Sequence, residues 1–336
     1  MKKNKILLVG MGPRGLNWLN VIQSSKIVKL VGICDINKKT KANLKLLKLS
    51  HIDFYEDLEK SINETQPDII LLATPPFKRM QDIKICAINK LPILVEKPLA
   101  TDINEARKIV QYMCDKNLLL MVGLNFRYLP VTQKYIQLIK QKTVGKPAYA
   151  KFIYERWRDG KLKYLNKYPL TMDHPMLWEQ SIHHFDLIRY IYKSDVKNVY
   201  AQTWNPKWSM YKHHTNIFAL FELKNGMKIN YIGTWQGSSK KLNFEWRTEC
   251  EDGIIIQREQ FSDLYYSKKK SSKLIKVPLK KITMWKYDAE LLLRDFINSI
   301  KDIKKIKTSG IDHLKSLDIV EACIKSAETG KKIALK

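Results

Sequence analysis

Residues 5–15 read Lys-Ile-Leu-Leu-Val-Gly-Met-Gly-Pro-Arg-Gly, an apolar run that passes directly into a glycine-rich turn. The run Ile6–Val9 is typical of a buried parallel strand. Leu16, Leu19 and Ile22 follow at helical spacing. The stretch therefore predicts a strand, a tight turn and a helix, in which free N–H groups at the helix start can hold an anion.

The three glycines of the turn are expected to have separate tasks. Gly10 allows the tight turn, Gly12 lets a pyrophosphate approach the backbone, and Gly15 lets helix and strand pack closely. The next strand, Ile27–Cys34, ends at Asp35, twenty residues after Gly15. An acidic residue at that distance can accept hydrogen bonds from the adenosine ribose. The pattern predicts a dinucleotide-binding site.

Asp35 also bears on the choice of cofactor. A carboxylate accepts hydrogen bonds from a free 2′-hydroxyl and repels a 2′-phosphate, which favours NAD over NADP. Lys38 and Lys39 follow closely and could partly compensate that repulsion. We therefore expect NAD as the cofactor, with NADP possible.

Length and composition are those of a globular protein with two domains. The chain has 336 residues, of which 45% are hydrophobic and 28% charged. No apolar run approaches the ~20 residues of a membrane span. Lysines precede Ile6–Val9 as in a signal peptide, but that apolar run is too short for one. We expect a cytoplasmic protein without a membrane partner.

The net charge is +27, from 60 basic and 33 acidic residues. Such a charge can serve binding to nucleic acid or to an anionic membrane surface. The lysines are spread along the chain, however, and the two clusters, Lys268–Lys270 and Lys301–Lys307, are not interleaved with aromatic residues as a base-stacking surface would be. A lysine-rich solvated surface is favoured, and no nucleic-acid partner is expected.

The five cysteines are scattered and include no C-x-x-C pair. This spacing argues against both a disulfide framework and a zinc site, so no metal is expected. Most of the cysteines are expected to be small core residues.

Strand-like and helix-like segments alternate through the first third of the chain. This alternation predicts a doubly wound parallel sheet, a Rossmann domain over residues 1–124. Ligands of such sheets bind at the carboxyl ends of the strands. Gly10, Asp35, Thr74 and Glu96 each lie just beyond such an end, so we expect them to converge.

The pattern changes over residues 125–336. Segments rich in aromatic and β-branched residues follow one another with few helices between them, which predicts an α+β domain with an open, mostly antiparallel sheet. A single helix is expected at about Met176–Tyr192, and two more at about Tyr287–Lys301 and His313–Thr329. The expected strands are 149–157, 199–204, 217–223, 228–235, 244–249, 254–258 and 264–266.

A combination of motifs then points to a known family. In chain order these are Gly10-x-Gly12-x-x-Gly15, Asp35, Thr74-Pro75-Pro76, Glu96-Lys97-Pro98 and Asn125-Phe126-Arg127-Tyr128. With the antiparallel sheet that follows, the chain resembles the glucose–fructose oxidoreductase / inositol dehydrogenase / MocA family over nearly its whole length. The resemblance implies an oligomer, a dimer or tetramer, formed through the open sheet, and a bond before Pro98 that is often cis.

The family also carries a D-x-x-x-H-x-x-D pattern on a helix of its second domain. Here His183 and Asp186 match its second and third positions, while Glu179 stands where the family has Asp. On an α-helix these three residues share one face. His184 competes with His183 on composition alone, and the resemblance selects His183. Asp186 fits a structural role equally well.

The chemistry of alcohol oxidation suits these residue types. A hydride leaves carbon and a proton leaves oxygen, and a histidine can take that proton near neutral pH. A lysine cation can stabilise the negative charge that develops on the oxygen. We assign His183 as the general base, Lys97 as the alkoxide-stabilising donor and Glu179 as an orienting group; which of Lys97 and His183 takes the proton first stays open.

The remaining expected contacts follow from motif positions and from the resemblance. Arg156 or Arg158 is a candidate for binding an anionic or hydroxyl-rich substrate, because guanidinium presents a planar fork. The family often has a histidine shortly after Thr-Pro, where this chain reads Phe77-Lys78-Arg79, so no role is assigned to position 79. The substrate-binding residues expected are Lys97, Arg127, Arg156, Arg158, Glu179, His183 and Trp235. The cofactor-binding residues expected are Gly10, Met11, Gly12, Pro13, Arg14, Gly15, Asp35, Thr74, Pro75, Glu96, Lys97 and Asn125.

The resemblance implies an NAD(P)-dependent oxidoreductase that acts on a hydroxyl or carbonyl carbon of a sugar, polyol or carbohydrate derivative. One alternative is a redox-neutral enzyme that uses tightly bound NAD for elimination or glycoside cleavage. Another is a non-catalytic NAD-binding regulator that binds nucleic acid, against which the intact Lys97 and His183 argue.

Overall fold

Strand β1 (Asn4–Val9) forms the centre of a parallel sheet, as its unbroken apolar run predicts. Residues 6–8 have no exposed surface, because β1 pairs in parallel with β2 (Val28–Cys34) on one side and β4 (Ile69–Leu72) on the other. The other strands are β3 (Phe54–Tyr55), β5 (Ile93–Val95) and β6 (Leu120–Val122), in the order β3-β2-β1-β4-β5-β6. The prediction of a doubly wound parallel sheet is confirmed.

The strand order reverses between β1 and β4, and this reversal decides which helices share a face. Right-handed crossovers place the helices before and after the reversal on opposite faces of the sheet. Accordingly α3 and α5 both contact α4. The helices that connect these strands are α1 (Pro13–Ser24), α2 (Lys39–Leu46), α3 (Leu58–Thr65), α4 (Arg79–Ile88) and α5 (Ile103–Asp115).

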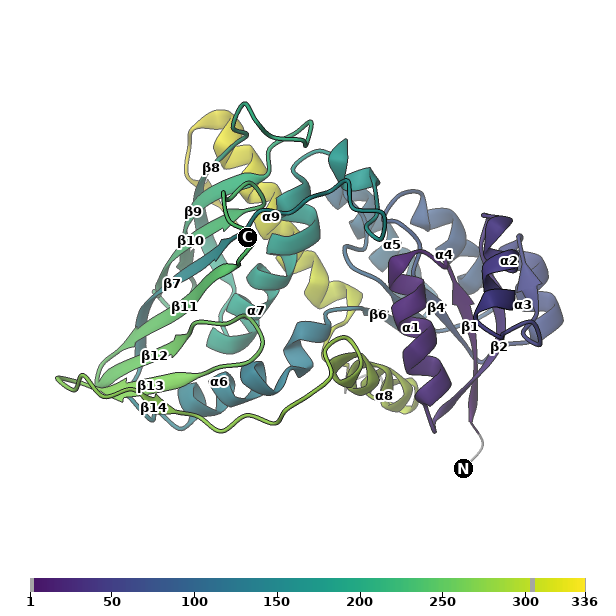
Figure 1. Cartoon of the computed structure of the whole chain (residues 1–336), viewed down its shortest axis with the longest axis horizontal. Coiled ribbons are helices and arrows are strands. Elements are labelled where there is room, and N and C mark those ends of the chain that lie inside the picture. The colour runs from purple at the N-terminus through teal and green to yellow at the C-terminus, as the bar shows by residue number, and fades with distance from the viewer. Residues whose placement is uncertain (1–2, 303–305, 336) are drawn as a thin grey trace. The chain divides into compact units, whose positions relative to one another are not determined.

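The computed structural model describes residues 3–302 and 306–335, and it divides into two compact units (Figure 1). The first unit is Met1–Asn125 with Thr283–Leu314, and the second is Phe126–Ile282 with Lys315–Lys336. The segment Thr283–Leu314, placed by the sequence in the second domain, therefore belongs to the first. Its helix α8 (Tyr287–Lys301) contacts α1, and the backbone N–H of Val122 donates to Thr308 O at 2.8 Å.

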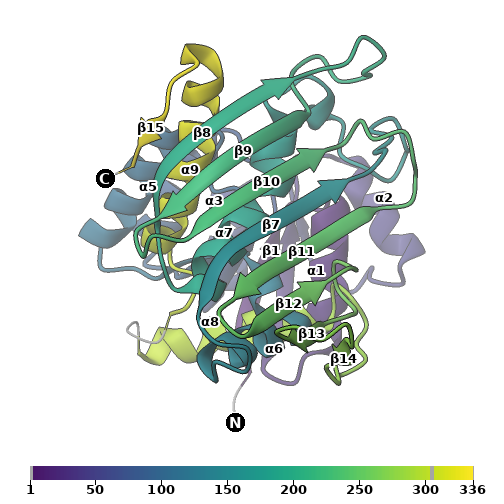
Figure 2. The same cartoon turned by 90° about the vertical axis from the view of Figure 1, so that its left-hand side faces the viewer.

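The second unit is built on a long sheet whose face is seen in Figure 2. Within the part of the chain that is described, its strand order is β14-β13-β12-β11-β7-β10-β9-β8-β15. All neighbours pair antiparallel except β7 and β10, which are parallel, so the expected mostly antiparallel sheet is confirmed. The strands are β7 (Pro147–Glu155), β8 (Val196–Trp204), β9 (Asn216–Leu223), β10 (Lys228–Thr234), β11 (Asn243–Cys250), β12 (Gly253–Gln257), β13 (Tyr265–Lys268), β14 (Ile275–Lys276) and β15 (Ile333–Ala334).

One face of this sheet is covered by helices, and its aromatic side chains form the core. Phe185 on α7 packs edge-on against Phe221 and Tyr231 of the sheet. The other face is open on β8 and β9, where Phe218 and Leu220 are 52% and 57% exposed. The helical elements are η1 (Asn125–Tyr128), α6 (Pro130–Lys140), η2 (Tyr168–Leu170), η3 (Leu177–Ser181), α7 (Ile182–Tyr192) and α9 (Gly310–Thr329).

The expected single helix over 176–192 is wrong in its first part, because η3 is a π-helical turn that precedes α7. A π turn closes i→i+5 hydrogen bonds, so the 3.6-residue spacing does not hold through it. Glu179 lies in η3 and His183 in α7. Over the two described ranges, none of the helices has the length and apolar character needed to cross a membrane.

Candidate active site

The glycine-rich turn of the first unit presents bare backbone at the carboxyl end of β1. Gly10 has φ +90°, and a Cβ there would lie 2.9 Å from the backbone of Ala73 and Thr74. A Cβ on Gly15 would lie 2.0 Å from Gly10 O, so side chains are excluded at both positions. Helix α1 begins at Pro13 and has no acidic residue in its first turn. The turn therefore fits the pyrophosphate of a dinucleotide.

Asp35 is bonded to this turn from the end of β2. Its Oδ2 accepts from Met11 N at 2.5 Å, and its Oδ1 accepts from Asn37 N at 2.7 Å. Each carboxylate oxygen has a second lone pair. Asp35 thus holds the turn and retains acceptor capacity for ribose hydroxyls, as expected of a residue that selects NAD.

Glu96 lies beneath the same turn and is 4% exposed. Its Oε1 accepts from Arg14 Nη2 at 2.7 Å and from Trp18 Nε1 at 2.6 Å, both on α1. Burial alone would raise the pKa of Glu96, but the charge and hydrogen bond of Arg14, with the bond from Trp18, hold it below its usual value. The carboxylate stays ionised and ties the end of β5 to the glycine turn.

Lys97 follows Glu96 directly and is half-buried, and the bond Lys97–Pro98 is cis. The backbone on both sides of Lys97 accepts hydrogen bonds from Arg79, which also binds Thr74 O. Pro75 beside Thr74 is exposed. The carboxyl ends of the parallel strands thus bring together Gly10, Asp35, Thr74 and Glu96, as the positions of the strand ends predict. The sequence assigns Arg79 no role, because it stands where the family often has a histidine.

Asn125, expected at the cofactor, is fully buried and donates through Nδ2 to Asp288 Oδ2 on α8. Burial raises the pKa of Asp288, while this hydrogen bond opposes the shift. In this structure the side chain of Asn125 joins the loop after β6 to α8. Its direct contact is with Asp288, and we infer a supporting role for it.

His183 and His184 have different surroundings in the second unit. His184 is fully buried: its Nδ1 is 2.8 Å from Tyr231 Oη, and its Nε2 is 3.1 Å from Gln180 Nε2. Burial lowers the pKa of His184 to about 3. His183 stacks on Phe126, with ring centroids 4.1 Å apart. His184 is thus a core residue that is neutral near pH 7, and His183, itself 4% exposed, stays the candidate base that the family pattern selects.

Glu179 is half-buried in the π-helical turn η3. Its Oε1 accepts a hydrogen bond from Tyr168 Oη at 2.7 Å. Tyr168 lies in η2 and was not identified from the sequence, because nothing in its spacing marks it as a partner of Glu179. The hydroxyl fixes one oxygen of the carboxylate.

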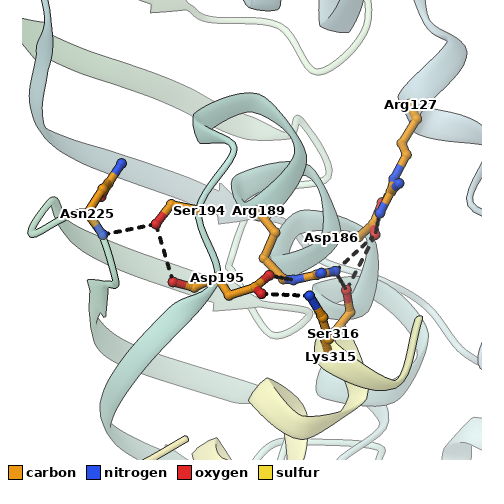
Figure 3. A network of polar contacts seen from close by, with 8 residues as sticks. All are labelled: Arg127, Asp186, Arg189, Ser194, Asp195, Asn225, Lys315 and Ser316. Carbon is orange, nitrogen blue, oxygen red and sulfur yellow. Dashed lines mark hydrogen bonds and ion pairs between the residues drawn. The ribbon is translucent and has the colours of Figure 1, made fainter. Parts of the chain in front are cut away.

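Arg127 and Asp186 form a buried bidentate pair (Figure 3). Arg127 Nε and Nη2 donate to the two carboxylate oxygens at 2.7 and 2.5 Å, and the residues are 5% and 1% exposed. The guanidinium also lies 4.6 Å from the ring centroid of Tyr190. Arg127, expected to bind substrate, is thus engaged with Asp186 inside the unit.

Two arginines at the end of β7 lie beside an aromatic pair. The guanidinium of Arg158 is 4.0 Å from the ring centroid of Trp235, and its Nη1 donates to Tyr211 Oη at 3.1 Å. Among the described residues, the buried donors Arg156 Nε and Trp235 Nε1 have no hydrogen-bond partner. Both are N–H groups, so this end of the sheet is suited to a ligand that accepts hydrogen bonds.

The glycine-rich turn Gly10–Gly15, Asp35 and the loop that carries Glu96 and Lys97 are the features of a dinucleotide-binding protein of the Rossmann class. Comparison with known families agrees: residues 4–124 match the oxidoreductase family with an NAD-binding Rossmann fold, and residues 132–256 match the GFO/IDH/MocA C-terminal domain. The chain belongs to the Gfo/Idh/MocA family and is an NAD-binding oxidoreductase.

Two curated relatives and one solved structure illustrate matches over nearly the full length at low identity. An uncharacterized protein y4oX of Sinorhizobium fredii is 23% identical over 99% of this chain and 96% of its own. A D-apiose dehydrogenase of Rhizobium rhizogenes is 23% identical over 99% and 98%. An oxidoreductase from Agrobacterium radiobacter, solved with NAD+, L-tartaric acid and magnesium, has a TM-score of 0.88 at 19% identity and covers 99% and 98%. These likenesses show a shared fold.

The buried His184 gives a prediction for acid stability. Its pKa of about 3 in the fold lies below the ordinary 6.5, so the unfolded chain binds a proton that the folded chain does not. The free energy of unfolding is therefore expected to fall by about 1.4 kcal/mol per pH unit below pH 6.5 from this residue. Between pH 7.5 and 5.0, urea unfolding should show a loss of stability that is smaller in His184→Gln by about this contribution and is unchanged in the exposed His51→Gln. Equal slopes for wild type and His184→Gln would contradict it.

Proposed function

We propose that this chain is an NAD-dependent dehydrogenase that interconverts a secondary hydroxyl and a carbonyl on a sugar, polyol or related carbohydrate derivative. The observation that carries the proposal is the hydrogen bond between Arg14 and Glu96. This hydrogen bond joins the glycine-rich turn, where the cofactor would bind, to the loop after β5. Lys97, which follows Glu96 in the chain, therefore stands next to a residue that is bonded to that turn. The division of labour is a cofactor-binding first unit and a substrate-binding second unit.

In this scheme NAD would be held by the turn Gly10–Gly15 and by Asp35, and it would supply the acceptor for the hydride of the carbinol carbon. His183 accepts the hydroxyl proton, since a neutral imidazole is suited to that role near pH 7. The role assigned to the ammonium of Lys97 is to stabilise the negative charge that develops on a substrate oxygen. Glu179, with one oxygen fixed by Tyr168, orients the groups that exchange the proton.

The substrate class is inferred from the donors at the end of β7. Arg156 Nε and Trp235 Nε1 are buried donors that a hydroxyl or carboxylate oxygen would satisfy. Arg158, packed over Trp235, adds positive charge. Polyols and sugar acids supply many such acceptors, and relatives include D-apiose and myo-inositol dehydrogenases.

Absorbance of reduced nicotinamide tests the proposal. The enzyme is mixed with NAD or NADP and a panel of pentoses, hexoses, inositols, sugar acids and sugar phosphates. Turnover of one carbohydrate supports the proposal. The redox-neutral alternative would instead be favoured if no member of the panel reduces the nicotinamide, NAD is retained through purification and product is released without added cofactor.

A preference for NAD over NADP of at least about tenfold is expected, which corresponds to about 1.4 kcal/mol of repulsion between Asp35 and a 2′-phosphate. Asp35→Asn keeps one acceptor oxygen and removes the charge, so the preference should shrink towards one. Titration of both cofactors against wild type, Asp35→Asn and the exposed control Asp53→Asn measures it. Equal affinity of wild type for both cofactors would disprove the preference.

We further propose a dimer or tetramer that assembles through the open face of the second unit. Tyr200, Trp204, Phe218 and Leu220 on β8 and β9 are between 36% and 57% exposed, and apolar surface gathered in this way marks an interface. Sedimentation velocity measures the oligomeric state directly.

A cytoplasmic location is proposed as well, since the five cysteines are free thiols and free thiols persist in a reducing compartment.

A further inference from the structure

Arg79, the first residue of α4, is 1% exposed. An arginine is almost never fully buried unless its charge and donors are matched. Asp82 lies one turn further along α4, where burial raises its pKa and Arg79 opposes that shift. The positive charge of Arg79 therefore has the carboxyl group of Asp82 nearby. Its buried N–H donors must be matched by other groups.

The donors of Arg79 bind backbone carbonyls from two loops. Nη2 donates to Thr74 O, in the loop after β4. Nη1 donates to Glu96 O and Pro98 O, and lies 3.4 Å from Leu99 O, all in the loop after β5. Glu96 and Pro98 are the residues on either side of Lys97. One rigid guanidinium thus bridges the ends of two neighbouring strands and holds the backbone that carries Lys97.

Other contacts hold the same loop at its edges. Arg14 and Trp18 bind the side chain of Glu96, and Leu99 N is 3.3 Å from Nε2 of His313. The contacts from Arg79 differ in kind, because they act on main-chain oxygens immediately before and after Lys97. The planar guanidinium of Arg79 has several N–H donors in fixed directions and can hold both carbonyl groups in place at once. A lysine ammonium on its flexible side chain does this less well.

We propose that Arg79 is a positioning residue of the active site, which fixes the Glu96–Pro98 backbone so that Lys97 is held ready for the substrate oxygen. The inference rests on the proposed role of Lys97, while the anchoring of the loop is a separate, measurable claim. Misplacement of a catalytic group by about 1 Å can cost about 10²-fold in rate. Loss of Arg79 should therefore lower kcat with little change in KM for the substrate.

The first experiment measures the loop without reference to activity. Amide hydrogen exchange is followed by mass spectrometry in full-length wild type, Arg79→Lys and Ile83→Val. Ile83 is buried on the same helix, so its variant loosens α4 without removing the fork. Exchange in peptides covering residues 96–100 should rise about tenfold or more in Arg79→Lys and stay near wild type in Ile83→Val. Unchanged exchange in Arg79→Lys would overturn the proposal.

The second experiment is a double-mutant cycle on kcat with Arg79→Lys and Lys97→Met. Arg79→Lys alone should lower kcat about 10- to 100-fold with KM within about threefold, yet add less than about threefold in the Lys97→Met background. Effects that multiply would show that Arg79 does not act through Lys97, and would overturn the positioning role. Full activity of Lys97→Met alone would refute the role of Lys97, and with it the positioning role of Arg79, while leaving the dehydrogenase function in place; hydrogen exchange would still decide whether Arg79 anchors the loop.

Discussion

Lys97→Met is expected to lower kcat by about 10³-fold, the loss found when a preorganised donor to a developing oxyanion is removed. Methionine is close to lysine in length and lacks the charge. The surrounding backbone is held by Arg79 and by the buried Glu96, so the loop should keep its shape in the variant. Steady-state assay of nicotinamide reduction on the substrate found in the panel measures the loss.

The matched control for this prediction is Lys84→Met, an exposed lysine on α4. It changes the net charge equally and should leave kcat unchanged. NAD affinity, followed by quenching of tryptophan fluorescence, should change by less than about tenfold in Lys97→Met, since the cradle at Gly10–Gly15 and Asp35 remains. A kcat within threefold of wild type would remove Lys97 from the chemistry.

Much of the cofactor half of the site could be predicted because its geometry follows from strand order. In a parallel sheet the carboxyl ends of neighbouring strands meet at one edge. Asp35 after β2, Thr74 after β4 and Glu96 after β5 are therefore brought together by the fold, whatever the details of the loops. Apolar runs such as Ile6–Val9 identify these strands without ambiguity, because a strand buried on both faces tolerates little polarity.

The parts that were missed depend on contacts that no local pattern records. Helix α8 is amphipathic, and amphipathicity does not say which core the apolar face covers, so its place in the first unit was not foreseen. The π-helical turn Leu177–Ser181 is only five residues long, which is too short for a hydrophobic spacing that would distinguish it from an α-helix. Arg79 reads as an ordinary arginine, because its partners are backbone oxygens 5 to 19 residues away. Tyr168 was missed because nothing in its spacing marks it as the partner of the Glu179 carboxylate, 11 residues further along the chain.

Removal of the Asp186 carboxylate is expected to lower the stability of the fold more than the chemistry. Asp186 accepts two hydrogen bonds from Arg127 and one from Ser316 at 3.3 Å, and Arg189 Nη1 lies 3.9 Å away (Figure 3). Asp186→Ala leaves the buried cations without that counter-charge, which costs about 3–5 kcal/mol when one partner of such a pair is lost. Urea or thermal unfolding measures this loss.

A second substitution separates the structural role of Asp186 from a catalytic one. If Asp186 serves to neutralise Arg127, Arg127→Met should recover most of the stability lost in Asp186→Ala, because the double variant no longer buries that unpaired guanidinium. The residual cost would come from Arg189, which keeps Asp195 as a partner at 2.9 Å. Asp186→Asn, assayed well below its unfolding temperature, should retain kcat within about tenfold of wild type. A kcat loss as large as that of Lys97→Met in a fully folded Asp186→Asn would instead place this carboxylate in the reaction.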